Sequence, residues 1–125
     1  MWDYRAKLLE VVDGDTLNLL IDTGFSGRVE EAIRLKDVFA PEKNQPGGKE
    51  VKGFVAWWLG NSMNSALKWP LQVYTRPNTK LEPDEIRTFT RYVGVVQAIG
   101  AIPTLNEALI MFLAQHPEWG KGIGG

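Results

Sequence analysis

The chain has 125 residues, 44% hydrophobic and 23% charged, which are the proportions of an ordinary globular protein of one domain. It has no cysteine and one histidine, which excludes disulfides and thiolate chemistry and leaves hard cations on carboxylate and carbonyl oxygens as the expected metals. The net charge of −1 argues against a module that binds DNA by neutralising many phosphates, but an enzyme can hold a few phosphates locally.

The first half of the chain predicts a hairpin, a third strand and a helix. Residues 4–12 and 16–22 are predicted to pair around Asp13-Gly14, because glycine accepts the positive φ that hairpin turns require. Residues 28–39 are predicted to form the third strand. A helix from about Lys49 to Met63 follows, with one apolar stripe: Val51, Phe54, Val55, Trp58 and Leu59. Trp57 lies off this stripe and is a candidate stacking or partner surface.

The second half predicts two more strands and a final helix. The strands cover residues 69–76 and 88–99. Thr104 and Glu107 fit a capping box for the helix, which His116-Pro117 ends. Its apolar stripe is Leu105, Ala108, Leu109, Phe112 and Leu113.

The order of these elements predicts the fold class and the domain organisation. Five strands, with a helix after the third and another after the fifth, indicate an all-β/α+β protein with a five-stranded OB-fold barrel, although other α+β topologies share this order. Residues 1–119 are predicted to form this single domain, and residues 120–125 a glycine-rich tail. The first residues, MWDYRAK, lack the apolar region of a secretory signal, so a cytoplasmic location is predicted.

Three charged residues interrupt stripes that alternation predicts to be apolar. Asp15 begins the stripe of Leu17, Leu19 and Ile21; Asp37 interrupts Ile33, Leu35 and Phe39; Arg91 interrupts Phe89, Val93 and Val95. A strand end that is half exposed, or a bulge that shifts the alternation, would explain each charge in structural terms. The functional explanation is that Asp15 and Arg91 lie where the core meets a pocket at the rim of the barrel, because an isolated buried charge is costly.

Four motifs resemble the staphylococcal nuclease (thermonuclease) family in the family's order. They are DGDT at 13–16, RLKDVFAPE at 34–42, TRYVGVV at 90–96 and LNEAL at 105–109. The chain is most similar to small phage-encoded members. This resemblance implies a five-stranded OB-fold barrel and calcium-dependent cleavage of DNA or RNA phosphodiester bonds.

The resemblance also implies a role for each matching residue. Asp15 corresponds to the calcium-binding aspartate, and Ala40 to the residue whose backbone carbonyl binds calcium. Arg34 and Arg91 correspond to the two arginines that hold and stabilise the phosphate. Glu42 corresponds to the glutamate that positions or activates the attacking water. An arginine can offer a planar charged fork to two phosphate oxygens, and a carboxylate can orient a water, so these residue types suit the reaction.

The chain departs from the family at two places. Phe39 stands where the family supplies a second calcium aspartate, and Asp37, about 6.6 Å away along an extended strand, is a weaker candidate ligand. Thr88 and Phe89 stand where a lysine and a tyrosine contact the terminal phosphate, and Arg87 is a nearby substitute.

Two functions therefore remain open. The first is a calcium-dependent nuclease of reduced activity. The second is a degenerate member of the fold that binds nucleic acid or a protein partner without cutting. The structural alternatives are that Arg34 is an ordinary exposed strand arginine and that Glu42 is an exposed loop residue. Asn106 and Glu107 are predicted to cap and brace the last helix.

Overall fold

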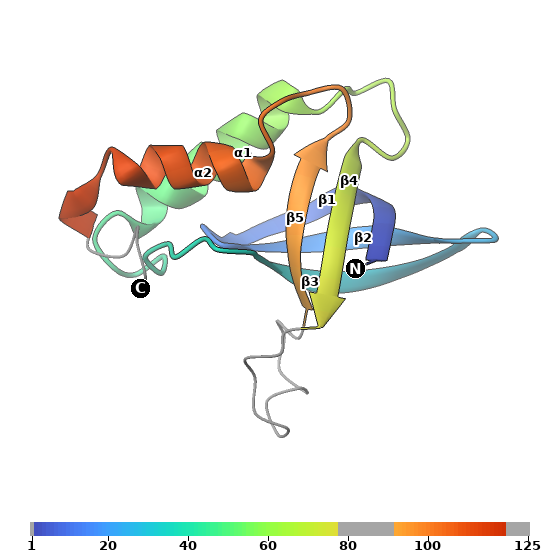
Figure 1. The fold of residues 1–125 in the computed structure, drawn as a ribbon, viewed down its shortest axis with the longest axis horizontal. Helices are drawn as coiled ribbons and strands as arrows, with labels where there is room; N and C mark the ends of the chain where they lie inside the picture. The colour runs from blue at the N-terminus through green and yellow to red at the C-terminus, as the bar shows by residue number, and fades with distance from the viewer. Residues whose placement is uncertain (1, 78–91, 120–125) are drawn as a thin grey trace.

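The computed structural model describes residues 2–77 and 92–119, and in this part of the chain five strands close into a barrel with two helices beside one end (Figure 1). The elements are β1 (Trp2–Asp13), β2 (Thr16–Gly24), β3 (Gly27–Leu35), α1 (Gly48–Ser62), β4 (Leu71–Pro77), β5 (Tyr92–Ala98), α2 (Leu105–Ala114) and the short 3₁₀ helix η2 (Pro117–Trp119). No helix in these ranges is long and apolar enough to cross a membrane.

The strand order β1-β2-β3-β5-β4 confirms the predicted barrel. β1, β2 and β3 form an antiparallel meander, β5 pairs in parallel with β3 and antiparallel with β4, and β4 returns to β1. β1 pairs with β4 through its first residues and with β2 through the rest, and two register shifts in its β2 pairing let it bend between them. One helix follows β3 and one follows β5, as predicted, so the protein is an OB-fold-like barrel.

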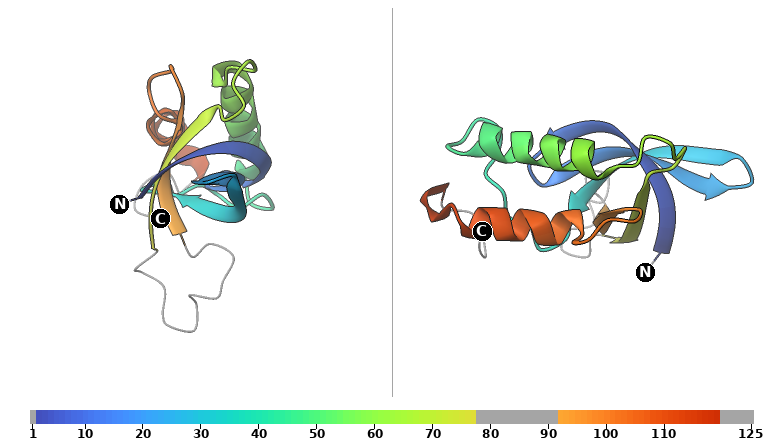
Figure 2. Two further views of the ribbon diagram at one scale, coloured as in Figure 1. Left: turned by 90° about the vertical axis from the view of Figure 1, so that its right-hand side faces the viewer. Right: turned by 90° about the horizontal axis from the view of Figure 1, so that it is seen from above.

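The two helices lie side by side and close the same end of the barrel (Figure 2). Val51, Val55, Trp58 and Leu59 of α1 are buried, which confirms the predicted stripe. Phe54 stacks on Phe112 of α2 with ring centroids 4.2 Å apart, so aromatic packing joins the helices. The predicted α2 stripe is also confirmed: Leu105, Leu109 and Leu113 are buried, and Ala108 and Phe112 pack against the core.

Asn106 anchors α2 to the barrel. This side chain is 4% exposed, accepts a hydrogen bond from the Val96 backbone N–H, and donates to the carbonyls of Lys36 and Gly94. At the helix start, Thr104 and Glu107 form both hydrogen bonds of a capping box, as predicted. The last helix is therefore capped by local residues and attached to β5 by Asn106.

The predicted third strand is too long. β3 ends at Leu35, and Lys36-Asp37 form a turn in which Asp37 has a φ of 63°, a left-handed conformation that aspartate tolerates better than most residues. Asp37 is exposed, and the buried residue of this segment is Val38. The prediction that Asp37 and Phe39 continue the inward face of Ile33 and Leu35 was wrong, because the turn ends the alternation.

The predicted inward face of the fifth strand was also wrong. In β5 the buried residues are Gly94, Val96 and Ala98, whereas Val93 and Val95 are half-buried on the other face. Apolar residues occur on both faces of this strand, so alternation alone did not distinguish them. Phe89 and Arg91 lie outside the described residues.

Candidate functional site

The turn between β1 and β2 is built around a close approach at Gly14. A Cβ atom at this residue would lie 2.5 Å from Cγ1 of Val51 and 3.0 Å from Cβ of Ala40. The φ of Gly14 lies outside the left-handed region, so the expected reason for glycine here was wrong. Glycine is needed because the turn packs directly on α1 and on the loop after β3, and this contact places Asp15 beside that loop.

Asp15 and Arg34 form an ion pair across the β2–β3 ladder. An Oδ2 atom of Asp15 lies 3.5 Å from Nη2 of Arg34, whose Cα pairs with that of Thr16. The Asp15 side chain is 16% exposed and that of Arg34 is 38% exposed. The carboxylate is therefore mostly covered, whereas the guanidinium can reach a ligand in solvent. Nη2 of Arg34 also lies 3.5 Å from the Val38 carbonyl, and this contact orients the guanidinium toward the loop after β3.

Burial raises the pKa of the Asp15 carboxyl above its ordinary value, because a charged group loses its hydration there. The Arg34 guanidinium, the Thr16 hydroxyl and the backbone of Ala40 each act in the opposite direction, and the charge of Asp13 adds to the rise. The Thr16 hydroxyl donates to Oδ1 of Asp15 over 3.1 Å. The carboxyl is thus held by three groups and still ionises less readily than a free aspartate.

The segment of residues 38–47 brings Ala40 and Glu42 to the same end of the barrel. The Lys43 backbone N–H donates to Oδ1 of Asp13 over 3.0 Å, which ties this loop to the β1–β2 turn. The Glu42 N–H donates to Oε1 of Gln45, and the Gln45 N–H donates to the Glu42 carbonyl. A Cβ at Gly48 would overlap the Glu42 carbonyl. The backbone of Glu42 is therefore fixed, while its side chain is exposed.

These residues fit a hard cation only in a hydrated form. In residues 2–77 and 92–119, no three His, Cys, Asp or Glu side chains gather at one point. The available oxygens are the Asp15 carboxylate, which already accepts a hydrogen bond from Thr16 and faces Arg34, and backbone carbonyls of the loop. The nearby Asp13 carboxylate accepts a hydrogen bond from the Lys43 N–H. Calcium prefers six to eight oxygens, so most of its ligands would be waters. Asp37, in its exposed turn, does not share the strand face on which its candidacy was based.

The strand register adds one arginine that the sequence reasoning missed. Val93 of β5 pairs with Arg34 on one side and with Arg76 of β4 on the other. The two arginines therefore lie on the same outer face, about 10 Å apart at Cα across two strand spacings. Nε of Arg76 is buried and has no hydrogen-bond partner within the described part of the chain. No sequence motif marks Arg76, because its neighbours are set by pairing between distant strands.

The other predicted site residues, Arg87 and Arg91, lie outside the described residues. The structure thus brings together Asp15, Arg34 and the backbone of Ala40, and it ties the loop that carries Glu42 to the same turn. The alternation that singled out Arg91 assumed that Val93 and Val95 face the barrel interior. They do not, so that argument for Arg91 no longer holds.

The barrel and this site define the class of protein as an OB-fold-like β-barrel with a carboxylate–arginine pair at the start of β2. Neither a scan against protein-family models nor a search of curated proteins found a match for this chain. The thermonuclease resemblance therefore stays a prediction from the quoted motifs.

Proposed function

We propose that the protein is a metal-dependent nuclease that hydrolyses phosphodiester bonds of DNA or RNA at the Asp15–Arg34 site, with a weakly held calcium ion. The observation that carries this proposal is the ion pair itself. Three segments distant in sequence place a mostly covered carboxylate beside a solvent-accessible arginine and a fixed loop backbone. A partly buried ion pair loses much of its Coulomb gain to desolvation, so this arrangement is better explained by what it binds.

Each residue has a role that its chemistry suits. Arg34 offers a bidentate fork to the phosphate and stabilises the negative charge that develops on its oxygens. Asp15 fixes the orientation of that guanidinium and supplies a carboxylate oxygen for a cation. Glu42, exposed on a rigid backbone, accepts the proton of the attacking water. A hard divalent ion bound there would neutralise part of the phosphate charge.

A cleavage assay with matched arginine variants tests the proposal. Supercoiled plasmid and single-stranded RNA are incubated with the protein in calcium, magnesium, manganese or chelator. Arg34→Lys keeps the charge but loses the fork, so the rate falls by a factor of about 100 to 1,000. Arg28→Lys is the control, because Arg28 is exposed on the same strand and alternates to the same face. Cleavage that survives Asp15→Ala and Arg34→Lys alike would overturn the proposal.

A nucleic-acid-binding or partner-binding module that does not cut is the second candidate, favoured by the composition of the site. The described residues gather fewer than three carboxylates there, and Arg34 already faces Asp15. In this case the parent protein retains an oligonucleotide on a filter equally well with calcium and with chelator, and no substrate is cleaved in any ion.

A further inference from the structure

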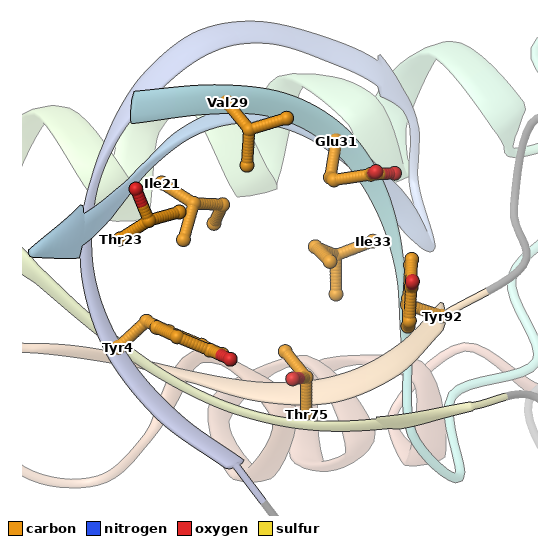
Figure 3. Close-up of a pocket in the computed structure, with 8 residues that line it drawn as sticks. All are labelled: Tyr4, Ile21, Thr23, Val29, Glu31, Ile33, Thr75 and Tyr92. Atoms are coloured by element: carbon orange, nitrogen blue, oxygen red, sulfur yellow. The ribbon is translucent and has the colours of Figure 1, made fainter. Parts of the chain in front are cut away.

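The barrel has a cavity at the end away from the helices, with a volume of about 230 Å³ (Figure 3). All five strands contribute to its wall. Ile33 is 2% exposed and Ile21 is 5% exposed, so part of its inner wall is apolar. Val29, 42% exposed, lies at its open side. Ligand pockets for drug-sized molecules span roughly 300–1,000 Å³, so this cavity suits a smaller ligand.

Polar side chains end the inward stripes of the strands at this cavity. Leu71 and Val73 of β4 are followed on the same face by Thr75, and Tyr92 precedes the buried Gly94 of β5. In β3, Glu31 shares the inward face of Ile33. Figure 3 shows Tyr4 directed toward the centre of the cavity, and Glu31 and Tyr92 together on one side of it.

The alternation argument for strand three did not consider Glu31, although this charged residue lies on the inward face of β3. Its Cα pairs with that of Leu19, which is fully buried, and it alternates with Ile33. Applying the test upstream of Ile33 would have found it. The Glu31 side chain is half-buried, so this inward position requires hydrogen-bond partners for its polar oxygens.

Two hydroxyls of the cavity are available to a ligand. Thr75 is 5% exposed, and neither its hydroxyl nor that of Tyr4 hydrogen bonds to any residue in the described part of the chain. The Thr75 side chain points into the cavity (Figure 3). A hydroxyl can donate and accept, and a carboxylate has about four acceptor positions, so Glu31 can take further hydrogen bonds beside those it already makes.

We propose that this cavity, the barrel-mouth pocket, binds a single nucleobase. Its apolar inner wall, two tyrosine rings and small volume suit one flat ring system. The Glu31 carboxylate accepts from N–H groups on the edge of the ring, while Tyr4 and Thr75 can match both donors and acceptors there. The inference goes beyond the proposed nuclease function and does not depend on it, because Arg34 lies on the outer face of the barrel and the pocket lies inside.

A titration followed by NMR tests the pocket directly. The ¹⁵N-labelled protein is titrated to millimolar concentration with guanosine, adenosine, cytidine or uridine, and with ribose as the control for the sugar. We expect at least one nucleoside to shift the backbone amides of Ile33, Thr75 and Gly94, with no effect of ribose. Absence of any shift, equal shifts with ribose, or shifts confined to Asp15 and Arg34 would overturn the proposal.

Variants then assign the binding to the pocket. Glu31→Gln removes the charge-assisted hydrogen bond and weakens binding by about tenfold or more. Glu30→Gln is the matched control, because Glu30 is exposed on the opposite face of the same strand. Thr75→Val keeps the shape of the side chain and weakens binding by about threefold to tenfold, so the test remains available if Glu31→Gln folds poorly. Equal effects of Glu31→Gln and Glu30→Gln would refute the assignment.

Discussion

Gly14→Ala should destabilise the protein, because it inserts a methyl group into the contact between the β1–β2 turn and α1. The new Cβ would lie 2.5 Å from Cγ1 of Val51, a fully buried side chain, and 3.0 Å from Cβ of Ala40. Overpacking of this kind costs about 1–3 kcal/mol, and the reduced entropy of the unfolded chain offsets about 0.4–1 kcal/mol of that. We expect a net loss of about 1–2 kcal/mol. For 125 residues this lowers Tm by about 4–8 °C.

The assay is thermal unfolding followed by circular dichroism, with Gly53→Ala as the control. Gly53 lies in α1, and a Cβ there would meet nothing within 4 Å, so this change should raise stability by about 0.5–1 kcal/mol through helix propensity. A double-mutant cycle with Val51→Ala isolates the contact. Removing the Val51 methyls should abolish most of the cost of Gly14→Ala, with a coupling free energy of about 1 kcal/mol.

Two results would refute this reasoning. If Gly14→Ala melts at the temperature of the parent protein, the turn does not pack on α1 as closely as the structure shows. If the cost is the same with Val51 and with Val51→Ala, the loss comes from the backbone of the turn and not from the contact.

Three other changes have defined outcomes. Asp15→Asn should be more stable than the parent at pH 7, because the raised pKa makes ionisation of the folded carboxyl unfavourable. This gain should shrink as the pH falls through the raised folded pKa and be gone below about pH 4, where the carboxyl is protonated in both states. Urea unfolding at about pH 7 and about pH 3.5 measures this, and an equal difference at both pH values would contradict it. Asn106→Ala should cost about 1–3 kcal/mol in urea unfolding by leaving the buried Val96 N–H without a partner, whereas Asn61→Ala on the exposed face of α1 should change stability by less than about 0.5 kcal/mol. Arg76→Gln, if Arg76 holds a phosphate beside Arg34, should reduce the salt dependence of single-strand binding by about 0.7 in log–log slope, and an unchanged slope would exclude that contact.

The secondary structure of this protein was largely predictable because its signals are local. Helical spacing of apolar residues located α1 and α2, and Thr104 and Glu107 located the start of α2, because these patterns depend on neighbours within two turns. The boundaries were less predictable. β3 stops at Leu35 although apolar residues continue to Phe39, because the turn at Asp37 redirects the chain toward the loop that packs on Gly14.

The candidate site was only partly readable from the sequence. The motifs named Asp15, Arg34 and Glu42, and the structure joins the first two in an ion pair and ties the loop of the third to the same turn.

By itself, then, the sequence determined which segments form strands and helices and that Asp15 and Arg34 belong to one candidate site. Only the tertiary structure decided which face of β5 is inward, that Arg76 shares the face of Arg34, and that Glu31 lines a cavity. The physical reason is that these placements depend on the register between strands far apart in the chain and on closure of the barrel. A shift of one residue in that register would turn every side chain of a strand to the opposite face.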